Sequence, residues 1–151
     1  MSFWDWLKPK PKFKPSTVEE LVQHFNGDII KISQWIGDNV WYRQDRVPAD
    51  EWQRPTTTLT RLKGDCEDFA VLYSKVFTIL DWEHWICTGH PKRGSGHAIC
   101  VVDTPKGYAY TSNDRFMLSR KKDWKLVAKD SMPDMAIYWH TDCLGITIEA
   151  F

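Results

Sequence analysis

The sequence lacks several features that would assign the protein to a broad class. Neither sign of charge is in excess, because 20 Lys and Arg residues balance 20 Asp and Glu residues. No overall field therefore draws the chain to nucleic acid, and we expect no nucleic-acid partner. No apolar run of signal-peptide length opens the chain, and nowhere do 18 apolar residues follow one another. We expect a cytoplasmic protein whose function depends on a local site.

The four cysteines also lack the spacings that define common cysteine-rich sites. Cys66, Cys87, Cys100 and Cys143 form no C-x-x-C pair and show no zinc-ligand spacing with the five histidines. A zinc site and a disulfide framework are thus both disfavoured, and free thiols in a reducing compartment are the simpler interpretation. We expect Cys87, Cys100 and Cys143 to be core residues.

Hydrophobic and aromatic residues are abundant enough for one folded domain. The 151 residues are 42% hydrophobic and include nine tryptophans, so residues 16–151 are expected to form a single domain. Residues 1–15 differ, because prolines alternate with lysines there and exclude a long helix. We expect an extended tail or anchor. Its residues 1–14 would contact a partner protein or a membrane surface, or else pack on their own domain; its apolar cluster is Phe3, Trp4, Trp6 and Leu7.

The hydrophobic periodicity predicts an α+β fold. Helices are expected over 17–25, where Ser16 and Glu19 have capping-box spacing, over 28–37, and from Asp65 as N-cap to about residue 80. Residues 40–60 are expected to be mostly loop. Strands are expected at 83–90, 96–103 and 107–114, with a further pair at 135–140 and 146–151. This order favours N-terminal helices and a central buried helix packed on an antiparallel sheet.

Cys66 lies among three acids, in the stretch LTRLKGDCEDFAVLYSKVF. Nearby negative charge raises the pKa of a thiol and weakens it as a nucleophile. The first turn of a helix has the opposite effect, because its free N–H groups favour an anion. The helical period also places Cys66 on the buried face, where His97 at the start of a strand could form a Cys–His ion pair with it.

The residue that orients His97 depends on the turn between the two predicted strands. A two-residue turn at Pro105 and Lys106 places Asp114 opposite His97. A three-residue turn instead brings Asn113 diagonally onto the same face as His97. The sequence leaves both registers open, and we take Asp114 as the first candidate.

Three segments together resemble a known family. They are DRVPADEWQRPTTTLTRLKGDCEDFAVLYSKVF, GHAICVV and YAYTSND, spanning roughly residues 40 to 114. They are similar to the transglutaminase-like superfamily, and most of all to bacterial transglutaminase-like cysteine proteinases. The resemblance implies a papain-like fold and a catalytic triad of Cys66, His97 and Asp114. One departure is that the family usually ends this strand with Asp then Asn, whereas this chain has Asn113 then Asp114.

The resemblance also raises the question of a metal. Acids beside the cysteine bind calcium in some family members, so Asp65, Glu67 and Asp68 are candidate calcium ligands, although no cofactor is required. The simpler interpretation is that these acids complement the helix dipole.

The function expected from these features is cysteine-dependent acyl transfer. We expect a protease or amidase that acts on a peptide or carboxamide through a thioester. A transglutaminase or deamidase is one alternative, and a non-catalytic binding or structural module with the same fold is another. Trp52 is expected to pack or to line the acyl pocket. The other histidines are expected to be structural or exposed: His24, His84, His90 and His140.

Overall fold

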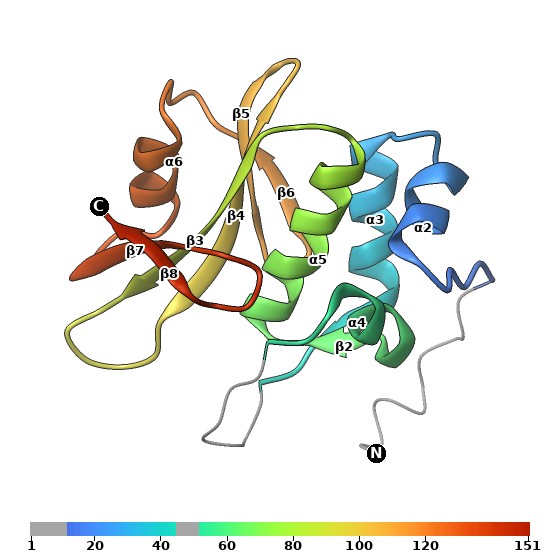
Figure 1. Ribbon diagram of the computed structural model, residues 1–151, viewed down its shortest axis with the longest axis horizontal. Coiled ribbons are helices and arrows are strands. Elements are labelled where there is room, and N and C mark those ends of the chain that lie inside the picture. The colour runs from blue at the N-terminus through green and yellow to red at the C-terminus, as the bar shows by residue number, and fades with distance from the viewer. Residues whose placement is uncertain (1–11, 45–51) are drawn as a thin grey trace.

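The computed structural model describes residues 12–44 and 52–151, and a six-stranded antiparallel sheet forms its centre (Figure 1). The strand order is β6-β5-β4-β3-β7-β8. The strands are β3 (His84–His90), β4 (His97–Thr104), β5 (Gly107–Ser112), β6 (Arg115–Leu118), β7 (Ile137–Thr141) and β8 (Thr147–Ala150). A short parallel pair, β1 (Trp41–Tyr42) and β2 (Lys63–Gly64), lies apart from this sheet.

Helices cover both faces of the sheet. The helix α5 (Cys66–Ile79) packs on β4 and β3, and three further helices gather around it on the same side (Figure 1). These are α2 (Val18–His24), α3 (Ile29–Asn39) and α4 (Pro55–Arg61). The remaining described helix, α6 (Trp124–Ser131), packs on β4 and β5 from the opposite side.

The helix α5 follows from the apolar spacing of its sequence. Phe69, Ala70, Tyr73, Val76 and Phe77 are buried, as the helical period predicts. The helix begins with a reciprocal capping box. The Asp65 carboxylate accepts from the N–H of Asp68, and the Asp68 carboxylate accepts from the N–H of Asp65. Two of the free N–H groups at this helix end are thereby satisfied, which fixes where Cys66 begins the helix.

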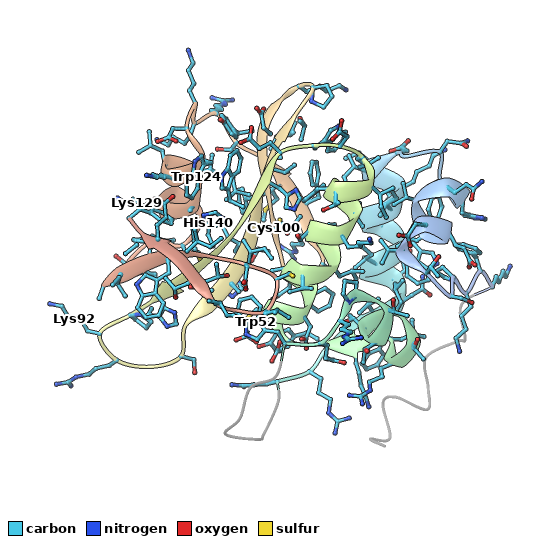
Figure 2. The ribbon with its side chains drawn as sticks, viewed as in Figure 1. Trp52, Lys92, Cys100, Trp124, Lys129 and His140 are labelled. Carbon is cyan, nitrogen blue, oxygen red and sulfur yellow. The ribbon has the colours of Figure 1, made fainter. Side chains whose placement is uncertain are left out.

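The alternation of side chains along β3 and β4 divides the core in two. Cys100 faces α5 in the larger cluster, whereas Cys87, Ile99 and Val101 face α6 in the smaller one. The indole rings of Trp85 and Trp124 pack against the smaller cluster and stack on each other, with their centroids 5.1 Å apart. Figure 2 shows Trp124, Lys129 and His140 gathered on that side of the molecule.

Most of the predicted elements are confirmed. Thr104 pairs with Gly107 across a two-residue turn, and β7 pairs with β8. The expectation of mostly loop over residues 40–60 is wrong for residues 55–60, because α4 begins at Pro55, and residues 45–51 lie outside the described residues. The sequence also missed β6 and α6. At the start of α2 the cap is Thr17, whose hydroxyl accepts from the N–H of Glu20, so the Ser16 capping box is displaced by one residue.

The predicted tail is only partly described. Phe13 stacks on His24 at 3.7 Å and meets Trp35 edge-on, so this part of the chain packs on the domain. The apolar cluster of Phe3, Trp4, Trp6 and Leu7 lies outside the described residues, and its partner or membrane contact stays a prediction. No helix in the described ranges combines the length and apolar character that crossing a bilayer requires.

Candidate active site

Cys66 is held at the edge of a cleft by the start of α5. Its thiol lies close to the backbone of Ala98 on β4 and of Glu67 on its own helix, and the side chain is 9% exposed. The cleft has a volume of ≈ 430 Å³ and is lined by both Cys66 and His97. The helix and the sheet therefore bring the two predicted reactive residues to one cavity.

The surroundings of the thiol keep it protonated. Burial, together with the charges of Glu67 and Asp65, raises the pKa of Cys66 to about 12, although the N–H groups of Ala98 and Glu67 act in the opposite direction. Burial thus outweighs the helix N-terminus, from which the sequence predicted a lowered pKa. Cys66 rests as a neutral thiol in this structure.

His97 is the first residue of β4, and its ring is held by a hydroxyl. The Nε2 atom of His97 lies 2.9 Å from Oγ of Ser112 on β5. Burial lowers the pKa of His97. Near pH 7 the cleft therefore contains a neutral thiol and a neutral imidazole.

Asp114 lies in the turn after β5 and faces α3. The strand ends at Ser112, Asn113 adopts a left-handed φ of 51°, and the chain returns as Arg115 pairs with Ser112. The Asp114 carbonyl accepts a hydrogen bond from the Tyr73 hydroxyl at 2.5 Å. One Asp114 carboxylate oxygen is only 2.8 Å from where a Cβ on Gly37 would lie. The hydrogen bond on the His97 ring is made by Ser112, and the triad role of Asp114 stays a prediction.

The acids beside Cys66 are engaged in the fold. Asp68 is 1% exposed, and Gln53 donates to both of its oxygens, from the backbone N–H at 2.7 Å and from Nε2 at 2.6 Å. Within residues 12–44 and 52–151, no three His, Cys, Asp or Glu side chains form a group that could hold a metal ion. Calcium at Asp65, Glu67 and Asp68 stays a prediction.

Aromatic and polar side chains form the walls of the cleft. Trp52 and Trp139 line it together with Thr88, Thr141 and His90. His90 was expected to be structural or exposed, and the sequence analysis missed its place in the cleft. The alternation of side chains along β3 could have indicated this position, because His90 lies two residues beyond Thr88. Thr88 pairs with Ala98, which lies beside the thiol.

Trp52 separates this cleft from a second hollow. Figure 2 shows Trp52 at the foot of α5, and a Cβ on Gly145 in the β7–β8 loop would lie 2.8 Å from its ring. The second hollow has a volume of ≈ 350 Å³ and contains Cys143 and Leu144. Cys143 is exposed, so its expected core position is wrong, whereas Cys87 and Cys100 are buried as expected.

Comparisons with known proteins agree with this architecture. Two solved structures share the fold. One is a Cytophaga hutchinsonii protein assigned as a cysteine protease, with 18% identity and a TM-score of 0.53 over 72% of this chain and 41% of that one. The other is LapG of Legionella pneumophila, with 16% identity and a TM-score of 0.50 over 91% of this chain and 70% of that one. A search of curated proteins finds no match.

The family assignment rests on the region that contains the cleft residues Cys66 and His97. A family model described as a transglutaminase-like domain matches residues 18–110, which is more than half of the chain. The match spans α2 through most of β5, including α5 and the start of β4. The chain therefore belongs to the transglutaminase-like domain family, as its sequence motifs indicated.

Proposed function

We propose that the protein is a cysteine peptidase or amidase that cleaves a peptide or carboxamide bond through a thioester on Cys66. The observation that carries this proposal is the shared cleft, in which Cys66 begins α5 and His97 begins β4. The transglutaminase-like family and the names of the two similar structures support a cysteine-dependent enzyme of this kind.

The neutral resting state of the two residues defines the first step. His97 accepts the thiol proton as Cys66 Sγ attacks the substrate carbonyl, so the thiolate forms only as it reacts. The imidazolium then gives that proton to the leaving amine, and the C–N bond breaks to leave a thioester. Water attacks the thioester with His97 again accepting a proton, which releases the acid and returns Cys66 to the thiol.

The start of α5 supplies a donor for the oxyanion. The N–H groups of Asp68 and Phe69 bond to the side chain and backbone of Asp65. We propose that the Cys66 N–H, at the very start of this turn, binds the developing oxyanion. Its position on the nucleophile's own residue suits the tetrahedral intermediate of acyl transfer.

Two other functions use the same site. A transglutaminase or deamidase would form the same thioester from a glutamine side chain, and an amine or water would resolve it. A non-catalytic binding module is the second alternative. One observation favours it: the pKa of the Cys66 thiol is raised to about 12, and the His97 ring is hydrogen-bonded to the Ser112 hydroxyl and not to a carboxylate.

We predict that Cys66→Ala abolishes turnover while the fold is retained. A methyl group replaces the thiol with little loss of volume, so we expect a cost of about 1 kcal/mol and a melting temperature lower by about 2–4 °C. The measurement compares a protein extract treated with wild type, Cys66→Ala or His97→Ala, and scores new N-termini, deamidated glutamines and cross-links by mass spectrometry. Cys143→Ala, at an exposed cysteine, is the matched control.

The product distinguishes the alternatives. New N-termini that need Cys66 identify a peptidase, and deamidation or cross-links identify the other acyl-transfer activities. Turnover retained by a folded Cys66→Ala protein would end the thioester mechanism. A wild-type protein without any Cys66-dependent product would favour the binding module.

A further inference from the structure

The His97 ring is hydrogen-bonded to a hydroxyl group, that of Ser112. Resting on the proposed function, we propose that Ser112 positions His97: its Oγ accepts from Nε2–H and leaves Nδ1 as the atom that takes the Cys66 proton. Ser112 is a positioning residue in this arrangement, because it acts on the thiol only through the imidazole.

The strand register explains why Ser112 reaches His97. Ser112 pairs directly with Ile99, and His97 lies two residues before Ile99 on β4. The two side chains are therefore diagonal neighbours on one face of the sheet, and their 2.9 Å separation is a hydrogen bond. Ser112 is also paired with Arg115 on its other side. Because both neighbouring strands fix its backbone, the hydroxyl holds the ring at a defined position.

The chemistry of a hydroxyl differs from that of a carboxylate. A carboxylate would favour the imidazolium by charge, whereas a serine oxygen fixes the tautomer without adding a negative charge. The neighbouring elements contribute charged groups of both signs, namely Arg115 paired with Ser112, Asp114 in the following turn, and Asp65 and Glu67 at the start of α5. A neutral orienting group agrees with the lowered pKa of His97 and the protonated thiol.

The geometry of Asp114 supports the same assignment. Its carbonyl is bonded to Tyr73 and its carboxylate lies beside Gly37, so its contacts are with α5 and α3. The turn that gives Asn113 a positive φ ends the strand at Ser112, two residues before Asp114, so Asp114 does not pair opposite His97.

The test follows alkylation of Cys66 by iodoacetamide at pH 7 in the full chain, with mass spectrometry to separate it from Cys143. In this reaction the S–H proton passes to His97, sulfur bonds to carbon and iodide leaves. His97→Ala should slow it about 100-fold, the lower range for a general base. Ser112→Ala should slow the alkylation roughly three- to tenfold, the rate change that corresponds to the loss of one neutral hydrogen bond. Ser112→Thr keeps the hydroxyl, so its alkylation rate should stay within about twofold of the wild-type rate.

A second readout reports the hydrogen bond itself. In wild type and in Ser112→Thr, the Hε2 proton of His97 should give a proton NMR signal. In Ser112→Ala, exchange of this proton with water should remove the signal. Ser119→Ala, which removes a hydroxyl beyond the end of β6, should change neither readout. Asp114→Asn tests the competing assignment.

The outcomes separate this inference from the proposed function. If His97→Ala slows alkylation and Ser112→Ala does not, or if Asp114→Asn slows it more than Ser112→Ala, the role of Ser112 is overturned and the function stands. If His97→Ala has no effect, the proposed base is wrong. In that case the NMR signal still tests the hydrogen bond between Ser112 and His97. A signal that survives in Ser112→Ala would refute this hydrogen bond as well.

Discussion

Asp65 caps α5 and lines the cleft at the same time, so one carboxylate serves the fold and the site. Its side chain accepts from the N–H of Asp68 and is 6% exposed. Burial raises the pKa of Asp65 to about 6, with the charge of Asp68 acting in the same direction. The ionised form is thus disfavoured in the folded protein relative to the unfolded chain.

This raised pKa predicts how stability depends on pH. The folded pKa of about 6 exceeds the ordinary 3.8, so the stabilisation is fully present below about pH 4 and is lost as pH rises to about 6. We expect Asp65 to contribute a decrease of the order of 1–3 kcal/mol across this window. The measurement is urea unfolding from pH 4 to 7 for wild type and Asp65→Asn, since asparagine also caps helices.

The matched control for this prediction is Asp28→Asn. Asp28 is likewise an N-cap aspartate, on α3, but it is exposed. The difference between wild type and Asp65→Asn should change across pH 4–6, and Asp28→Asn measures what the same substitution does at an exposed N-cap. Equal pH profiles for wild type and Asp65→Asn would contradict the raised pKa.

Individual site residues could be predicted only as far as local spacing determines them. The cap at Asp65 and the buried face that contains Cys66 follow from the helical period, and the structure confirms both. The thiol pKa does not follow, because it depends on how closely β4 covers the helix start. Ser112 was missed since the sequence cannot reveal that Asn113 turns left-handed and ends β5.

At the scale of elements, the β7–β8 hairpin forms one side of the cleft through Gly145. This glycine has a φ of +83°, and a Cβ added to it would meet the Trp52 ring at 2.8 Å. Its backbone conformation and its close approach to the indole both require the absence of a side chain. The position of the hairpin therefore depends on this one residue.

Gly145→Ala should destabilise the protein and displace Trp52. The positive φ alone costs about 1–2 kcal/mol, and the steric contact adds to it. Gly107→Ala is the control, because Gly107 has a φ of +113° and nothing within 4 Å of the added Cβ. We expect a larger loss of unfolding free energy for Gly145→Ala, with a change in tryptophan fluorescence that Gly107→Ala lacks. Equal losses and unchanged fluorescence in both would show that the hairpin adapts freely.

Elements with a clear apolar period or a capping signal could be predicted from the sequence, and several elements without such a signal could not. The helix α5 and strands β3 to β5 have several turns or alternations, so their pattern is clear. The helix α4 reads PTTTLTR, and its β-branched threonines are poor helix formers. It forms because Pro55 suits the first helical position and Leu59 packs in the core.

At the scale of the whole molecule, the two parts of the core share the same strands. Ile86 and Cys100 belong to the cluster under α5, whereas Cys87 and Ile99, their neighbours along β3 and β4, belong to the cluster under α6. If β3 and β4 unfold, the buried side chains of both clusters become exposed to solvent. The sheet thus couples the two layers of helices.

This coupling predicts one cooperative unfolding transition. Melting curves from far-ultraviolet circular dichroism, which follows the helices, and from tryptophan fluorescence should coincide within error, as for a two-state domain. Trp124→Ala, in the smaller cluster, should lower both curves together by several degrees. Separate transitions, with only the fluorescence curve shifted, would show that the layer containing α6 unfolds by itself.

The free cysteines provide a graded set of chemical reporters for this behaviour. Cys143 is exposed, Cys66 borders the cleft, Cys100 lies under α5 and Cys87 lies under α6. A thiol reagent applied during partial denaturation would therefore record, site by site, which layer opens to solvent first. No cysteine has to be introduced for this measurement, because each layer already contains at least one buried thiol.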